Sequence, residues 1–309
     1  MTLRLGLGLP QMKQYEPGRD VTAVARAAEE SGFDSVWVFE RTLVPEHPVD
    51  GMYGVPDLPW SDAYRKVADP LVTLTLAAAV TERVRLGSCV LVAPLHAPFE
   101  LARTLGTLDA ASSGRLVAGF GTGWSRDEYE AAGSDFAARG TSLDELLDVC
   151  DAVWGPDPVS YEGARARIAA AEVGPKPVNG SVPVLLAART SRALDRVARR
   201  ADGWMPTGMP HAAVARTWAR IREQAERGGR DPDTLTMIQR CGVRITDAPL
   251  DGERGQHQGS VEQIVEDLAE GVASGVGEVI LELQRGARDA AELTGRARLL
   301  HAAVRDAGM

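Results

Sequence analysis

The chain has 309 residues, of which 44% are hydrophobic and 25% charged, and its 34 basic and 43 acidic side chains give a formal net charge of −9. This composition is typical of a globular protein that can bury a sizeable core. The acidic balance, with no block of Lys or Arg, argues against nucleic acid or an anionic membrane as a partner, because both select a basic surface. Three scattered cysteines, no signal-peptide pattern and no long apolar run predict a cytoplasmic protein.

Short strand-like runs alternate with longer amphipathic helical runs along the whole chain. In chain order, the expected strand and helix pairs are residues 4–9 with 21–31, 33–39 with 70–80, 85–92 with 99–112, 116–120 with 142–154, 182–187 with 191–200, 203–206 with 211–226, 235–244 with 260–274, and 278–283 with 290–307. Asp20 and Asp69 are placed to cap the first two helices. Capping boxes are expected at the fourth and seventh helices, from Ser142 with Glu145 and from Ser260 with Gln263.

Eight such units predict a single domain over residues 1–309, a closed (β/α)8 TIM barrel of the α/β class with insertions after the second and fourth strands. The alternative is an open, doubly wound parallel sheet. That alternative is disfavoured because no glycine-rich first turn marks a dinucleotide crevice.

In such a barrel, functional residues follow the C-terminal ends of the strands. The sequence GFGTGWS at residues 119–125 follows the fourth strand, where glycines let a backbone approach a flat ligand, although a tight turn would use them equally. After the fifth strand, Ala188, Arg189 and Thr190 begin a helix whose free amides could bind a phosphate. The alternative there is an ordinary hydroxyl cap beside a solvated arginine.

The segment at residues 45–60 is rich in proline and aromatic residues and is too long for a typical connection. It predicts a lid, with a disordered or decorative loop as the alternative. The five histidines occur singly, without an HExxH motif or a Cys-His cluster, so no metal site is expected.

Taken together, these motifs resemble the luciferase-like monooxygenase superfamily, and within it the oxidoreductases that use the deazaflavin coenzyme F420. The matching stretches are RLGLGLPQ from residue 4, ARAAEESGFDSVWVFER ending at residue 41, ADPLVTLTLAAAVTERVRLGSCVLVAPLHAP from residue 68, and TLDAASSGRLVAGFGTGWSRDEYEAAG from residue 107. The third and fourth stretches are specific, and the resemblance runs through most of the chain in order.

The resemblance implies a barrel that holds a flavin (FMN) or F420 with its ring over the third strand, backed by a non-prolyl cis peptide. The matching bond joins Cys89 to Val90, whereas the pattern alone would make Cys89 a buried core cysteine. The implied cofactor-binding residues are Glu40, Ser88, Cys89 and Val90 around the ring, Thr122 and Gly123 at its edge, and Ala188, Arg189 and Thr190 at the phosphate.

Two departures from the family pattern affect the expected chemistry. Members that oxidise alcohols often carry an Asp-His pair after the second strand, where this chain has Glu40 and Arg41. A guanidinium cannot act as a general base, so we expect Arg41 to stabilise negative charge on the substrate while Glu40 holds the ring. A salt bridge that fastens the lid is the alternative for Arg41. The other departure is that alanines replace the usual glycines after the fifth strand.

These features predict a cytoplasmic oxidoreductase that transfers hydride between reduced F420 and a small organic substrate. Three alternatives stay open: an FMN-dependent monooxygenase that uses oxygen and a partner reductase, a cofactor-free barrel enzyme acting on a phosphorylated metabolite, and a flavin-binding relative without catalytic activity. The resemblance also implies a homodimer.

Overall fold

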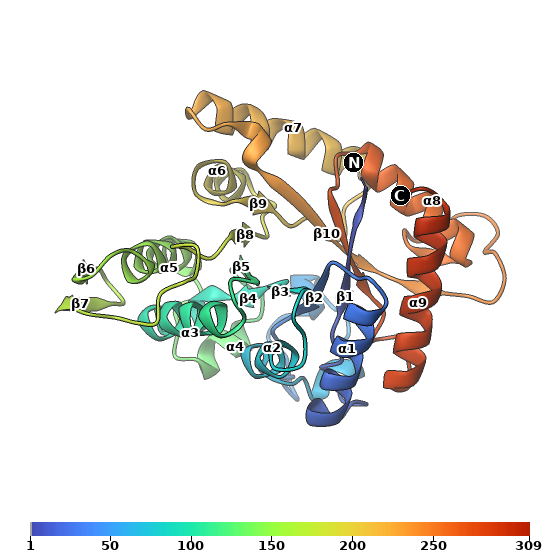
Figure 1. Cartoon of the computed structure of the whole chain (residues 1–309), viewed down its shortest axis with the longest axis horizontal. Coiled ribbons are helices and arrows are strands. Elements are labelled where there is room, and N and C mark those ends of the chain that lie inside the picture. Colours follow the sequence, from blue (N-terminus) through green and yellow to red (C-terminus); the bar gives the residue numbers. More distant parts are fainter. Residues whose placement is uncertain (1) are drawn as a thin grey trace.

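Eight parallel strands close into a barrel in the computed structural model, which describes residues 2–309 (Figure 1). Around the barrel the strands are β1 (Arg4–Gly8), β2 (Ser35–Val38), β3 (Arg85–Ser88), β5 (Leu116–Gly121), β8 (Val184–Leu186), β9 (Gly203–Trp204), β10 (Thr236–Gly242) and β13 (Glu278–Glu282). Each strand pairs with the next, and β13 pairs in parallel with β1, so that Leu5 lies opposite Val279. This closure confirms the (β/α)8 barrel and excludes the open sheet.

The main helices lie outside the barrel, where they cover the strands (Figure 1). They are α1 (Thr22–Glu30), α2 (Pro70–Ala78), α3 (Pro98–Ala111), α5 (Arg139–Trp154), α6 (Ser191–Arg200), α7 (His211–Arg227), α8 (Val261–Ala273) and α9 (Ala290–Asp306). All eight expected helices are therefore present, with ends shifted by a few residues. None of the helices within residues 2–309 is both long and apolar enough to cross a membrane.

The signals at helix starts were only partly right. Asp69 caps α2, and Ser260 and Gln263 form the expected capping box at α8. The cap at Asp20 is wrong because a π-helical turn, η1 (Pro17–Val21), precedes α1 and places Asp20 inside the helical segment. There its carboxylate accepts a hydrogen bond from the Glu16 amide at 2.8 Å.

The capping box at Ser142 is also wrong. Helix α5 begins three residues earlier, at Arg139, so Ser142 lies inside it and its side chain caps nothing. The Glu145 carboxylate instead accepts a hydrogen bond from the backbone amide of Arg165 at 2.6 Å. It thereby holds an antiparallel hairpin of β6 (Val159–Glu162) and β7 (Arg167–Ala171), which the sequence pattern did not predict.

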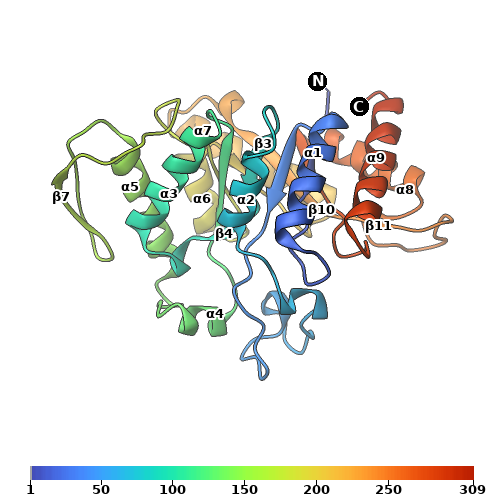
Figure 2. The ribbon, with the colours of Figure 1, turned by 60° about the horizontal axis from the view of Figure 1, so that its bottom comes forward.

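Two insertions lie at the C-terminal end of the barrel strands, on one side of the molecule (Figure 2). The insertion after β2 contains the short helices η2 (Met52–Gly54) and η3 (Asp62–Arg65), and the one after β5 contains α4 (Arg126–Ala131). Further short elements are η4 (Ala93–Leu95), η5 (Pro232–Thr234) and the paired strands β11 (Arg244–Ile245) and β12 (Gln258–Gly259).

The barrel interior is filled by one side chain from each of several strands. Trp37, Cys89, Val117, Leu185, Met205, Ile238 and Ile280 form this inner cluster, separate from the larger core between strands and helices. Along β13, Glu278 and Glu282 lie two positions on either side of Ile280 and share its inward face, because strand side chains alternate. The interior thus carries one carboxylate near each end.

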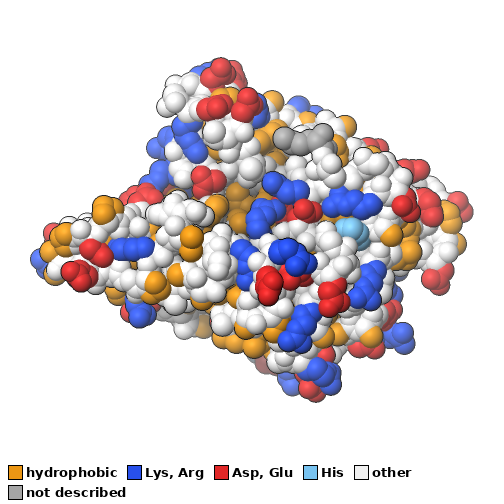
Figure 3. Space-filling view, in the orientation of Figure 1, with side chains coloured by type: hydrophobic (Ala, Val, Ile, Leu, Met, Phe, Trp, Pro, Cys, Tyr) orange, Lys and Arg blue, Asp and Glu red, His pale blue; other side chains and the backbone are white. Residues whose placement is uncertain are grey.

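At the N-terminal end of the barrel, fully buried Glu278 pairs with Arg85 and with Arg4, whose Nε lies 3.3 Å from Glu278 Oε2. Arg4, Arg85 and Arg115 help to line a cavity of about 240 Å³ at this end. Figure 3 looks onto this face, where Lys and Arg side chains gather around a hollow with an apolar interior. An ion pair at this end of a barrel serves stability, because the active site of a (β/α)8 barrel lies at the C-terminal end of the strands.

Candidate active site

The third barrel strand is interrupted at its C-terminal end. The expected run over residues 85–92 is divided into β3 and β4 (Leu91–Val92), and the Cys89–Val90 peptide between them is cis, as the resemblance implied. The Cys89 amide donates to the Val38 carbonyl at 2.7 Å. Burial raises the pKa of the Cys89 thiol to about 12, so it stays protonated at neutral pH.

The Ser88 side chain makes its hydrogen bonds to the neighbouring strand β5. Its hydroxyl donates to the Gly119 carbonyl at 3.0 Å and accepts from the Gly119 amide at 2.9 Å. Ser88 is buried, and its side chain fastens β3 to β5. Of the residues expected around the ring, Cys89 and Val90 form the peptide at the C-terminal mouth of the barrel, and Ser88 supports that peptide.

Glu40 is buried and bonded within the protein. One carboxylate oxygen accepts from the Val92 amide at 2.5 Å, and the other lies 2.8 Å from His96 Nε2. Burial alone would lower the pKa of His96, but the hydrogen bond and charge of Glu40 outweigh burial and raise that pKa. Glu40 therefore holds the end of β4 and the turn that follows it. Sequence reasoning missed His96 because 56 residues separate it from Glu40.

Arg41 lies in a buried ion pair with Glu128 of α4, and only 9% of its side chain is exposed. Its guanidinium also stacks over Trp124 at 4.7 Å and over Trp60 at 5.3 Å from the ring centroids. The next residue, Thr42, donates its amide to the same Glu128 carboxylate at 2.7 Å. These contacts join the two insertions and favour the lid salt bridge over a substrate contact for Arg41.

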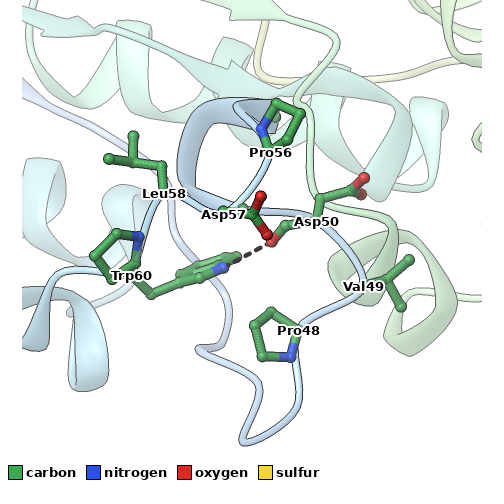
Figure 4. A pocket seen from close by; sticks show the side chains of 10 residues that line it. Pro48, Val49, Asp50, Pro56, Asp57, Leu58 and Trp60 are labelled. Carbon is green, nitrogen blue, oxygen red and sulfur yellow. Dashed lines mark hydrogen bonds between the residues drawn. The ribbon is translucent and has the colours of Figure 1, made fainter.

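Residues 45–60 form a loop whose residues line a half-open pocket of about 410 Å³ (Figure 4). Trp60 Nε1 donates to the Asp50 carbonyl at 3.0 Å, and the Asp50 carboxylate pairs with Arg126 of α4 at 2.5 Å. The Tyr53 hydroxyl lies 2.7 Å from that of Tyr64. The loop is thus held by its own side chains and docked on α4, an arrangement that suits a lid.

The glycines at the end of β5 serve packing between strands. A Cβ at Gly121 would meet Val90 Cγ2 at 2.7 Å, and one at Gly123 would meet Val92 Cγ1 at 2.6 Å. Gly123 also has a φ of +64°, which favours glycine. These contacts favour the structural reading of the GFGTGWS motif. Thr122 remains at the strand end, with its carbonyl bonded to the Tyr129 hydroxyl.

Ala188, Arg189 and Thr190 lie where β8 leads into α6, as expected. Thr190 caps the helix by accepting from the Ala193 amide at 3.4 Å. Amides in the first turn of a helix have no partner within it and attract anions. Arg189 is exposed, and its only hydrogen bond within residues 2–309 is a long one of 3.5 Å to the Gly208 carbonyl. This helix start therefore fits a phosphate.

A second ion pair lies inside the mouth of the barrel and was missed from the sequence. Arg240 on β10 donates to Glu282 on β13 at 2.6 Å from Nη2 and 3.1 Å from Nε. Its Nη1 reaches across to the Cys89 carbonyl at 3.5 Å, and its guanidinium lies 4.9 Å from the Phe39 ring centroid. The sequence could have predicted this pair, because a charged residue stands two positions after Ile238 on one strand and another stands two positions after Ile280 on the next.

Together these residues fit a flat ring that carries a phosphate arm. The mouth offers the Cys89–Val90 peptide, partly exposed Val90 and Ala187, and the donors of Arg240, while the start of α6 offers amides for an anion. Within residues 2–309 no three His, Cys, Asp or Glu side chains are grouped as metal ligands.

Comparison with known proteins decides the family. Residues 4–254 match the family model described as luciferase-like monooxygenase. The chain belongs to the luciferase-like monooxygenase family. It is therefore an enzyme of this oxidoreductase family, as the resemblance implied.

Two curated relatives illustrate the range of the family. An uncharacterized protein of Mycobacterium tuberculosis is 38% identical over 191 residues, which are 60% of this chain and 66% of that protein. The F420-dependent glucose-6-phosphate dehydrogenase of Nakamurella multipartita is 29% identical over 236 residues, 75% of this chain and 65% of that enzyme. The matched regions thus span just under two thirds of these relatives.

Solved structures share the fold over nearly the whole chain. The monooxygenase RslO1 from Streptomyces bottropensis has a TM-score of 0.81 at 20% identity and covers 99% of this chain and 100% of its own. An F420-dependent secondary alcohol dehydrogenase, in complex with an F420-acetone adduct, has a TM-score of 0.78 at 18% identity, with 99% and 100% covered.

Proposed function

We propose that this enzyme binds coenzyme F420 and transfers hydride between the reduced coenzyme and a small organic substrate. The observation that carries the proposal is the start of α6, where first-turn amides and the exposed side chain of Arg189 lie at the same end of the barrel as Arg240 and partly exposed Val90. Similarity to an F420-dependent glucose-6-phosphate dehydrogenase over 75% of this chain supports the deazaflavin. A cytoplasmic location and a homodimer are part of the same proposal.

The coenzyme supplies the redox chemistry when bound, and the protein supplies position and charge. The first-turn amides of α6, with Arg189 and the Thr190 cap, hold the phosphate. The Cys89–Val90 peptide backs the ring, with Thr122 and Gly123 at its edge. The buried Ala188, whose carbonyl accepts a hydrogen bond from Trp204 Nε1 at 3.0 Å, forms the turn that leads to this helix start.

Two residues act through their neighbours in this proposal. Glu40 positions β4, and therefore the Cys89–Val90 peptide, through the Val92 amide and His96. Arg41 fastens the lid to α4 through Glu128 and so excludes water from the mouth.

A monooxygenase that uses reduced FMN and a partner reductase is the second candidate. It is favoured by one feature of this chain: no histidine follows Glu40, and Arg41, which does, is locked in an ion pair and cannot accept a proton. The dehydrogenation of an alcohol lacks an evident base at this position. Reduction of an activated double bond or oxygen chemistry does not need one there.

Anaerobic mixing experiments separate the two candidates. The protein is mixed with reduced F420 or reduced FMN, and the bound cofactor is then exposed to oxygen while its absorbance is followed. We expect reduced F420 to bind and to stay reduced in the presence of oxygen. Addition of a hydride acceptor such as cyclohex-2-enone should then oxidise it. Rapid reoxidation of bound reduced FMN by oxygen, with no binding of F420, would instead establish the monooxygenase.

A further inference from the structure

We infer that Arg240 binds the oxygen atom of the substrate, and that the substrate class is compounds whose carbonyl group is conjugated to the carbon that accepts hydride. The inference rests on the proposed function. The sequence analysis expected Arg41 to stabilise negative charge on the substrate. The inference assigns this role to Arg240 instead.

The first argument is position. Arg240 lies on the inward face of β10, two residues beyond Ile238 of the inner cluster. Its side chain therefore lies inside the barrel, near the C-terminal end of the strands. Its Nη1 lies 3.5 Å from the Cys89 carbonyl oxygen, which belongs to the peptide assigned to the ring. A group bound against that peptide is therefore within reach of this side chain.

The second argument is the set of unused donors. A guanidinium has five N–H groups. Within residues 2–309, Arg240 uses two toward Glu282 and one, at the limit of hydrogen bonding, toward the Cys89 carbonyl. The remaining N–H groups belong to a side chain that is 21% exposed, whereas Arg41 is 9% exposed and paired with Glu128.

The third argument is charge. Burial would lower the pKa of Arg240, but the charge and hydrogen bonds of Glu282 outweigh burial and raise that pKa, so the cation persists at any working pH. Glu282 is itself held by Gln284 Nε2 at 2.8 Å. Because the pair is neutral overall, it favours an uncharged carbonyl over a phosphate or other strong anion.

The chemistry balances with the coenzyme as the reductant. When the substrate carbon accepts hydride, a C–H bond forms there and the electrons of the conjugated double bond move onto the carbonyl oxygen. Arg240 donates a hydrogen bond to that oxygen, where fixed donors stabilise developing charge most effectively. A proton from solvent then completes the reduced product, and the coenzyme is left oxidised.

The test uses the whole protein and two probes, cyclohex-2-enone as acceptor and cyclohexanone as a ligand that cannot be reduced at a C=C bond. Cyclohexanone binding is measured by tryptophan fluorescence with and without F420, for the wild type, Arg240→Lys and the double variant Arg240→Met with Glu282→Gln. The double variant avoids leaving a buried carboxylate without its partner. Its matched control is Arg85→Met with Glu278→Gln, the equivalent pair at the other end of the barrel.

We expect the Arg240 double variant to bind cyclohexanone about 10- to 100-fold more weakly, as the loss of a charge-assisted hydrogen bond predicts. The control should bind as the wild type does, Arg240→Lys should retain part of the affinity, and millimolar guanidinium should partly restore turnover of cyclohex-2-enone. F420 affinity should fall by a smaller factor than cyclohexanone affinity in the Arg240 variants, and it should equal that of the wild type in the control.

Equal cyclohexanone affinity in the wild type and the Arg240 double variant would overturn the inference, as would a wild type that binds F420 but not cyclohexanone. Failure of the wild type to bind F420 would overturn the proposed function instead. The cyclohexanone series on the protein without F420 would still decide the role of Arg240.

Discussion

At the scale of single residues, buried charges at the C-terminal end of the barrel are each matched by one partner from a distant part of the chain. Glu40 meets His96, Arg41 meets Glu128, and Arg240 meets Glu282. The sequence singled out Glu40 and Arg41 from their place after a strand. Their partners could not be predicted, because a side chain's neighbour across the barrel leaves no local pattern.

The Glu40–His96 pair predicts a specific pH dependence of stability. The pKa of His96 is raised in the folded state, so its stabilising contribution is complete below the unfolded value of about 6.5. That contribution is lost as the pH rises through the folded pKa. Urea unfolding of the wild type between pH 6 and 9 should show this loss, and Glu40→Gln should remove it.

Titration of the histidine ring signals by NMR checks the same prediction directly. Glu40→Gln should lower the pKa of His96 and leave that of His301 unchanged, since His301 bonds to the Gly32 carbonyl instead. An unchanged pKa of His96 would contradict the assigned pair.

At the scale of elements, the two insertions act as one unit held by the buried Arg41–Glu128 pair. Breaking such a pair from one side costs about 3–5 kcal/mol, because a buried charge is left without a partner. We therefore expect Glu128→Gln to lower the melting temperature and to speed proteolysis within residues 45–60. The exposed pair between Arg65 and Glu46 is the control, and Glu46→Gln should change unfolding by less than about 1 kcal/mol. Equal proteolysis rates would show that the pair does not hold the lid.

Helix starts provide a matched pair of predictions. Ser260→Ala should cost about 1 kcal/mol of unfolding free energy, because Ser260 caps α8. Ser142→Ala, at the position where the same sequence signal was wrong, should cost less, since Ser142 lies inside α5. Chemical denaturation of both variants checks this, and a larger loss for Ser142 would contradict the observed boundary of α5.

The alternation of strands and helices was predictable because each element has its own hydrophobic period. The elements that escaped prediction are short or polar: the β6–β7 hairpin is mostly exposed, and α4 has six residues. The cap at Asp20 was mistaken because a residue type favoured at helix starts also occurs inside a turn that extends the helix.

At the scale of the whole molecule, the barrel and the family could be inferred from the sequence, and the chemistry of the mouth only in part. The resemblance predicted the cis peptide between Cys89 and Val90, and the alternation of strands and helices predicted the start of α6. Neither could show that the Ser88 hydroxyl is hydrogen-bonded to Gly119 of β5, or that the glycines at 121 and 123 make room for Val90 and Val92. Those facts depend on packing between strands that are distant in the sequence.

The most direct test of the account is a parallel fluorescence titration of the purified protein with F420 and with FMN. It is repeated with Arg189→Ala and Thr190→Val, which weaken the proposed phosphate grip. The account predicts micromolar, selective binding of F420 to the wild type and at least a several-fold loss in both variants. Absence of binding to either cofactor, or binding that the two substitutions leave unchanged, would contradict it.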